Sequence, residues 1–130
     1  MQKIAMAHAD DPRAHIWKEI GDISKLEVFN TQVLVAVYIR PEKTKGGIIL
    51  TDRNRDEDRH QSKVGMILKM GHKAFVDPKE QWFAGASFSV GDWIVFRPSD
   101  GWGIGVNGYY CRMLEDVSVK MRIPHPDAVW

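Results

Sequence analysis

The sequence predicts an all-β domain, built as a small barrel or sandwich of short strands. From residue 28 onward, short apolar runs rich in Val and Ile recur along the chain. Turn signals made of Gly, Pro, Asn and Asp separate these runs, and many short strands divided in this way are typical of small barrels and sandwiches. The 130 residues suit a single domain. A domain of that size can bury a core without disulfides.

Three runs predict buried strands: Val33–Ile39, Val64–Met70 and Asp92–Phe96. The first run is apolar throughout and rich in β-branched residues, which is typical of a strand covered on both faces. Val117–Ile123 instead alternates apolar and polar residues, which predicts a half-buried strand. Asn107-Gly108 predicts a type I′ hairpin turn, because both residues tolerate positive φ.

The N-terminal part of the chain predicts one short helix. Asp11 is a favourable N-cap residue, and Pro12 is favoured at the first helical position. Ile16 and Ile20 are four residues apart and share a face, and a glycine follows that can end the helix. A helix from Pro12 to Ile20 is too short to be stable alone. We therefore expect it to pack either on this domain or on a neighbouring chain.

These patterns divide the chain into an N-terminal arm with a short helix (1–30), a β-barrel domain (31–123) and a C-terminal tail (124–130). Within the barrel domain, residues 41–63 form a long loop between two predicted strands. The loop contains a pair of glycines and an aliphatic triplet, followed by a run of charged residues. A loop of this length is uncommon in a small domain and is usually functional or disordered.

Composition excludes several classes of function. The 18 basic and 17 acidic residues leave a net charge of +1, which argues against a general nucleic-acid binder. No apolar run could span a bilayer, and the N-terminus lacks the features of a signal peptide, so we expect a cytoplasmic protein without a membrane partner. The single cysteine, Cys111, excludes an internal disulfide and fits a reducing compartment.

No catalytic or metal-binding pattern stands out. Cys111 lies between Tyr110 and Arg112 in or beside a predicted strand, so a buried, inert thiol is expected. Gly101–Gly105 lacks the strand before and helix after that a phosphate-binding loop requires, and instead predicts a tight turn or close packing. We predict neither an enzyme nor a bound metal or other cofactor. The histidines, scattered without ligand spacing, are His8, His15, His60, His72 and His125.

The order of motifs adds a family resemblance. A strand is followed by a loop with Gly-Gly-Ile-Ile-Leu-Thr, a strand that begins Val-Gly, a Val-Gly-Asp-Trp-Ile-Val-Phe run, Gly-Trp-Gly and a closing strand. This order, over about residues 30 to 123, resembles the GroES-type co-chaperonins (10 kDa chaperonins), and in particular those of phages and prophages. The resemblance implies a GroES-like small β-barrel with a long loop, a short N-terminal helix or arm and a C-terminal tail.

The resemblance also implies a partner-binding site. In this family the long loop docks an aliphatic triplet into a groove on a chaperonin ring that holds ATP. By resemblance Ile48, Ile49 and Leu50 are the docking residues, and Gly46 and Gly47 give the loop a flexible approach. The expected function is a co-chaperonin that caps the ring and assists protein folding.

The family forms a ring of seven subunits, in which the first strand of one subunit pairs with the last strand of its neighbour. That arrangement would place Gln32–Tyr38 beside Val117–Ile123 of the next chain and implies self-association. The subunit-interface residues implied by the resemblance are Val33, Val35, Val37, Val117, Val119 and Met121.

An alternative function is open at this point. Residues 1–30, the tail Pro124–Trp130 and the five tryptophans depart from the minimal family pattern. Tryptophan is enriched at protein interfaces. The chain could therefore be a phage virion component, a capsid decoration or cement protein that reuses the barrel. Its loop and arm would then clasp the major capsid protein, and it would reside in the virion rather than the host cytoplasm.

Overall fold

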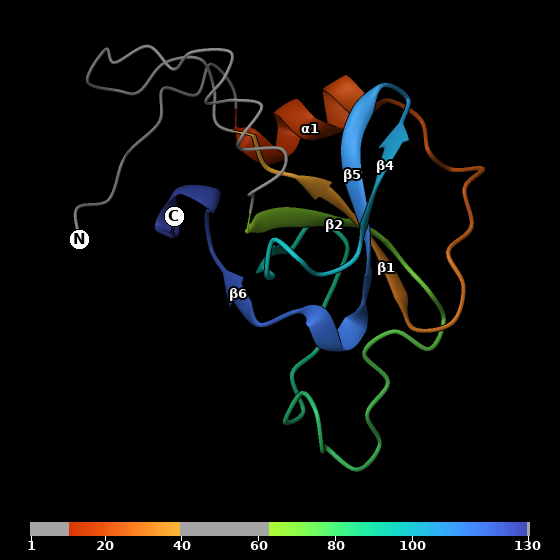
Figure 1. The fold of residues 1–130 in the computed structure, drawn as a ribbon, viewed down its shortest axis with the longest axis vertical. Coiled ribbons are helices and arrows are strands. Elements are labelled where there is room, and N and C mark those ends of the chain that lie inside the picture. Colours follow the sequence, from red (N-terminus) through yellow and green to blue (C-terminus); the bar gives the residue numbers. More distant parts are fainter. Residues whose placement is uncertain (1–10, 40–62, 130) are drawn as a thin grey trace.

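The computed structural model describes residues 11–39 and 63–129 of the 130-residue chain. A six-stranded antiparallel sheet with the strand order β4-β5-β1-β2-β3-β6 dominates these residues (Figure 1). The elements are α1 (Pro12–Ile20), β1 (Gln32–Val37), β2 (Val64–Met70), β3 (Trp93–Val95), β4 (Trp102–Val106), β5 (Tyr109–Glu115), the 3-10 helix η1 (Asp116–Ser118), β6 (Met121–Ile123) and the 3-10 helix η2 (Pro126–Ala128). The predicted all-β class with one short N-terminal helix is confirmed.

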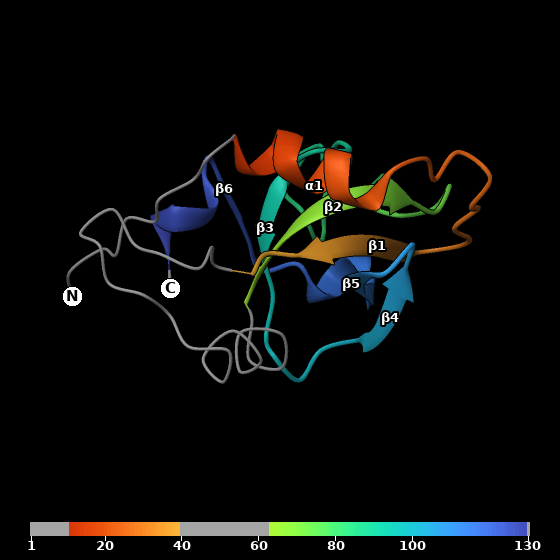
Figure 2. The ribbon, with the colours of Figure 1, turned by 90° about the horizontal axis from the view of Figure 1, so that it is seen from above.

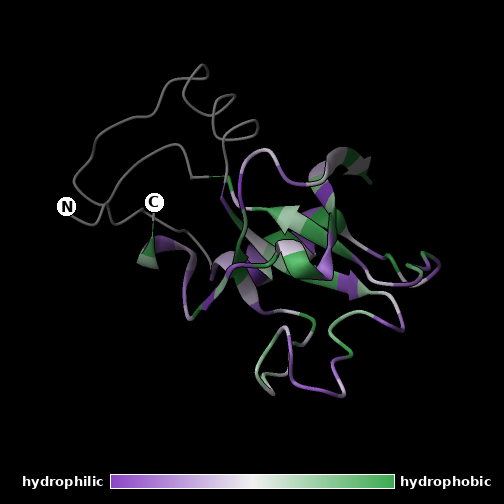
Figure 3. Cartoon of the chain, turned by 60° about the horizontal axis from the view of Figure 1, so that its bottom comes forward, coloured by the Kyte–Doolittle hydropathy of each residue, from purple (hydrophilic) through white to green (hydrophobic). Residues whose placement is uncertain are grey.

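Strand β1 is buried on both faces, as its all-apolar run predicts. Val33, Val35 and Val37 belong to one hydrophobic cluster, while Leu34 and Ala36 belong to a second cluster. Successive side chains of a strand point to opposite faces, so the two clusters lie on the two sides of β1. In Figure 3 much of the hydrophobic (green) colour falls on the strands. Because β2 and β5 also pair with its two edges, β1 is the centre of the fold.

Helix α1 has the predicted bounds and covers one side of this sheet (Figure 2). The Asp11 carboxylate accepts a hydrogen bond from the Ala14 N–H at 3.1 Å, and Gly21 ends the helix with a φ of 71°. Ile16 and Ile20 are buried in the cluster that contains Leu34 and Ala36. The short helix is therefore stabilised by its own domain rather than by a neighbouring chain.

The hairpin between β4 and β5 also matches its prediction. Asn107 and Gly108 have φ values of 49° and 81°, as a type I′ turn requires, and Val106 pairs with Tyr109 across it. The Asn107 side chain donates a hydrogen bond to the Ile20 carbonyl at 2.8 Å. The hairpin tip is thereby tied to the C-terminal end of α1.

The predicted strand Val117–Ile123 is wrong in its first half. Residues Asp116–Ser118 form η1, and only Met121–Ile123 pairs with β3. The cause is tertiary: the Asp116 carboxylate accepts the Phe75 N–H at 2.9 Å, and the Asp116 N–H donates to the Thr31 carbonyl at 3.0 Å. These two bonds hold the chain in a turn where the alternating pattern predicts an extended strand.

One carboxylate organises the connection between β2 and β3. Asp77 accepts hydrogen bonds from the N–H groups of Gln81, Trp82 and Phe83 at 2.8–2.9 Å. Trp82 is 67% exposed on this turn. Three aromatic rings of the same connection pack on one another, those of Phe75, Phe83 and Phe88.

We expect this turn to open in acid. The hydrogen bonds that Asp77 accepts from these backbone N–H groups hold its pKa below the ordinary value of 3.8, and the bond from Phe83 has the largest effect. A carboxyl with a lower pKa in the folded state adds stability that is complete above its unfolded pKa. That stability is lost as the pH falls through the folded pKa. Fluorescence from Trp82 should therefore change only below about pH 4.

The Trp82 signal can be isolated by subtracting the emission of a Trp82→Phe variant. Asp77→Asn removes the titrating group and should remove the acid-dependent step from that difference. An unchanged step in Asp77→Asn would assign the transition to another carboxyl group.

Candidate functional site

The described structure fixes the place from which segment 40–62 leaves the sheet. Strands β1 and β2 are antiparallel neighbours, with Val37 opposite Gly65. One residue further, the Tyr38 N–H donates to the Val64 carbonyl at 2.9 Å. The segment therefore departs from and returns to the same end of this strand pair. We call that end, residues Tyr38, Ile39, Lys63 and Val64, the root.

The root is held firmly by its neighbours. The Tyr109 hydroxyl donates to the Val37 carbonyl at 3.2 Å, and the Phe96 N–H donates to the Lys63 carbonyl at 2.8 Å. The rings of Tyr38 and Trp93 pack edge to face with centroids 5.9 Å apart. These contacts give the segment a fixed base on the sheet.

The residues predicted to bind a partner lie outside the described residues. They are Gly46, Gly47, Ile48, Ile49 and Leu50. Their role stays a prediction, and what the structure adds is the position of the root that carries them.

The predicted pairing of Gln32–Tyr38 with a neighbour's last strand does not fit this fold. Both edges of β1 hydrogen-bond within the chain, to β2 and to β5. A strand inside a sheet has no open row of N–H and C=O groups to offer another chain. Val33, Val35 and Val37 accordingly lie in the core of their own domain, each 0% exposed.

The other three predicted interface residues differ in exposure. Val119 is buried in a core cluster, whereas Val117 and Met121 are 44% and 51% exposed. Met121 belongs to β6, which is an outer strand of the described sheet, as is β4 at the opposite side. Val117 and Met121 therefore stay available as predicted contacts with another subunit.

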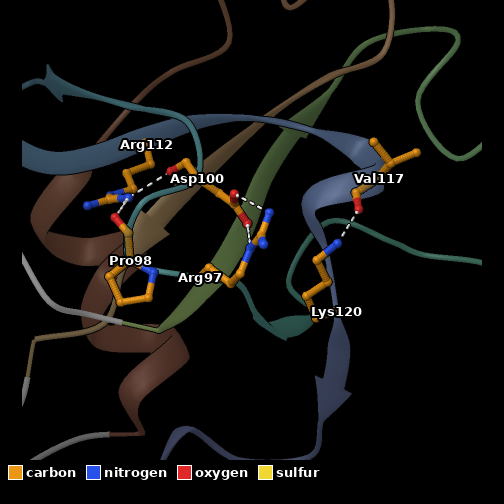
Figure 4. A network of polar contacts seen from close by, with 6 residues as sticks. All are labelled: Arg97, Pro98, Asp100, Arg112, Val117 and Lys120. Atoms are coloured by element: carbon orange, nitrogen blue, oxygen red, sulfur yellow. Dashed lines mark hydrogen bonds and ion pairs between the residues drawn. The ribbon is translucent and has the colours of Figure 1, made fainter.

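A turn at residues 97–101 is hydrogen-bonded to Arg112 of β5 (Figure 4). The buried Arg112 donates from one guanidinium nitrogen to the carbonyls of Pro98 and Asp100 at 2.5 and 2.7 Å. Arg97 pairs with the Asp100 carboxylate at 3.0 Å, and this bond lowers the pKa of Asp100. Gly101 has a φ of 70°, which confirms the predicted tight turn. Sequence reasoning missed Arg112, because nothing in the local pattern distinguishes it from a solvent-facing arginine.

An open groove of about 690 Å³ lies between β4 and the chain that follows α1. Its mainly apolar lining includes Leu26, Leu34, Met113 and Trp102, whose indole is 57% exposed. No sequence motif pointed to this groove, because its lining comes from stretches of chain that are far apart.

The described residues supply little for redox or metal chemistry. Cys111 is buried, as predicted, and burial raises the pKa of its thiol to about 12. In residues 11–39 and 63–129, no three His, Cys, Asp or Glu side chains come together as metal ligands. A helix long and apolar enough to cross a bilayer is not found in the same ranges.

Comparison with protein families decides the affiliation of the chain. The family model described as Chaperonin 10 Kd subunit matches residues 25–119, which is well over half of the sequence. The chain belongs to the Chaperonin 10 Kd subunit family. A comparison with curated proteins gives no match.

Membership of the Chaperonin 10 Kd subunit family implies a co-chaperonin, a class of protein that is not enzymatic, with a chaperonin as partner and with self-association. The antiparallel sheet with one short helix is consistent with the GroES-like small β fold of this family. The match includes the root and the predicted docking triplet, but α1, β6 and η2 lie outside it. Of these three elements, β6 pairs with β3 and so completes the same sheet as the matched strands.

Proposed function

We propose that this chain is a co-chaperonin that caps an ATP-loaded chaperonin ring through Ile48, Ile49 and Leu50 and so assists protein folding. The observation that carries the proposal is the family match over the strands on both sides of the segment. The root supports it, because a docking segment needs a fixed base from which its apolar residues can reach a partner. We expect this co-chaperonin to act in the cytoplasm.

The expected free energy of binding of segment 40–62 suits a lid that must bind the chaperonin ring and leave it again. Burying three aliphatic side chains contributes at most about 5–9 kcal/mol. Ordering a segment on binding costs about 2–5 kcal/mol, and association has its own entropic cost. One segment alone should therefore bind weakly. Several segments on one assembly gain avidity without any new contact.

Self-association would supply that multivalency. The outer strands β4 and β6 each have one edge without a partner strand in the described sheet. Such edges are ready to pair with another chain. We propose that contacts between subunits involve the β6 side, where Val117 and Met121 are exposed, and do not involve β1.

Native mass tests this function first. At low micromolar concentration a seven-subunit ring of 14.9 kDa chains would have a mass of about 104 kDa. The same sample should bind a chaperonin ring in the presence of ATP and not without nucleotide. A monomer that fails to bind with ATP would contradict the proposed function.

A phage origin is the finer part of the proposal, and it rests on the extensions around the matched region. The alternative function as a capsid decoration protein loses one of its supports, because α1 packs on its own sheet and is not free to clasp a capsid subunit. We therefore favour the co-chaperonin over the virion component.

A further inference from the structure

The C-terminal end of the chain meets the root of segment 40–62. After β6 the chain turns through η2, and the Asp127 carboxylate of that turn accepts a hydrogen bond from the Tyr38 hydroxyl at 2.9 Å. Tyr38 directly follows β1 and lies two positions before the segment begins. The contact joins residues that are 89 positions apart in the sequence.

This contact is partly buried, and the turn that carries Asp127 has hydrogen bonds of its own. Tyr38 is 4% exposed, and the side chain of Asp127 is 7% exposed. His125 Nδ1 accepts the Asp127 N–H at 3.1 Å, which closes the turn, and Pro126 is buried beside it. A hydrogen bond to a carboxylate is charge-assisted, and it is stronger than one between neutral groups.

The same tyrosine is tied to the sheet on its other sides. Its N–H makes the hydrogen bond to the Val64 carbonyl, and its ring packs on Trp93. Trp93 in turn pairs with Ile123 of β6, the strand that leads into the tail. Root, β3, β6 and tail therefore form one connected unit. The tail (124–130) lies outside the family match, which ends at residue 119.

We propose that Tyr38 and Asp127 form a latch, by which the C-terminal turn holds the root in place for chaperonin binding. Both are positioning residues: they act on the base of the docking segment and not on the partner itself. The consequence for binding rests on the proposed function, whereas the latch is a property of the folded chain and can be tested without a partner.

Amide hydrogen exchange tests the latch directly. In Tyr38→Phe and in Asp127→Ala, the backbone amide of residue 38, which donates to the Val64 carbonyl, should exchange roughly tenfold faster or more, the loss expected for a buried charge-assisted bond. The Ala36 amide, in the middle of β1, should not change. The effect of the double variant should be smaller than the sum of the two single effects, because both substitutions remove the same bond.

Tyr110→Phe is the matched control. It also removes a hydroxyl from a tyrosine that packs in the core, but Tyr110 packs on the cluster opposite to that of Tyr38. Exchange at the Tyr38 amide should stay as in the wild type. Asp127→Asn keeps an acceptor oxygen without the charge, and it should restore part of the protection.

Binding to an ATP-loaded chaperonin ring gives the second measurement. Both latch variants should bind about two- to tenfold more weakly, because a less ordered root adds to the entropy lost on docking. Tyr110→Phe should bind like the wild type, and the thermal midpoints of all variants show whether global stability contributes.

Each outcome decides the proposal. Unchanged exchange at the root in both latch variants overturns it. Faster exchange with unchanged affinity overturns the positioning role, provided that Ile49→Asp abolishes binding in the same assay. If the wild type itself does not bind, the proposed function fails, and the exchange data alone decide whether the latch exists.

Discussion

Replacing Ile49 by Asp should abolish binding to a chaperonin ring while the domain stays folded. A buried Ile side chain contributes roughly 1.5–3 kcal/mol. A carboxylate that entered the apolar docking groove of the chaperonin would lose its hydration without gaining a partner. In a multivalent assembly every segment carries the defect, so avidity falls as well. We expect affinity to drop by at least about a hundredfold, measured as ATP-dependent co-sedimentation with the ring.

Asn54→Asp is the matched control, since it adds the same charge to the same segment but outside the aliphatic triplet. Its affinity and the thermal midpoints of both variants should equal those of the wild type. Full affinity of Ile49→Asp would contradict the docking role of the triplet. An equal loss in Asn54→Asp would point instead to the overall charge of the segment.

Gly101→Ala should lower the free energy of unfolding by about 2–5 kcal/mol, through overpacking and backbone strain together. Gly101 has a φ of 70°, which side chains other than glycine's rarely allow. A Cβ atom there would also lie 2.2 Å from the Met113 carbonyl oxygen and 2.6 Å from Leu114 Cδ2. The backbone of β5 would have to move. Urea unfolding measures the loss, which is a large part of the stability of an ordinary domain.

Gly105→Ala, four residues further along the chain, is the comparison. Gly105 lies on β4 without a positive φ, and a Cβ atom there would meet nothing within 4 Å. Its free energy of unfolding should change by no more than about 0.5 kcal/mol. An equal loss in both variants would show that the cause is not the close approach at Gly101.

Local signals made much of the fold predictable. The bounds of α1 follow from a capping aspartate, a proline and a glycine that are neighbours of the helix in the sequence. The turn at Asn107-Gly108 needs only its own two residues. The prediction of a strand over Val117–Ile123 was wrong in its first half, because Asp116 is hydrogen-bonded to Phe75 and Thr31, which lie far from it in the chain. An alternating pattern cannot report a contact of that kind.

In the candidate site, too, features set by neighbouring residues could be predicted, and features set by distant contacts could not. The aliphatic triplet and its glycines could be recognised as a motif, because their chemistry is contained in five consecutive residues. The latch could not be recognised, because Tyr38 reads as an ordinary strand residue and Asp127 as part of a polar tail. The neighbours of β1 also escaped prediction, since several pairings of these strands suit the same hydrophobic pattern.

The central position of β1 has a consequence for biosynthesis. One of its two partner strands, β5, ends only at Glu115. The hydrogen bond from Asn107 to the Ile20 carbonyl, which joins the hairpin to the end of α1, likewise links residues 87 positions apart. Until β5 has been translated, β1 has one edge unpaired and its apolar side chains only partly covered. Pairings between such distant segments form slowly. The sheet around β1 can therefore close only once residues 109–115 of β5 are available to pair.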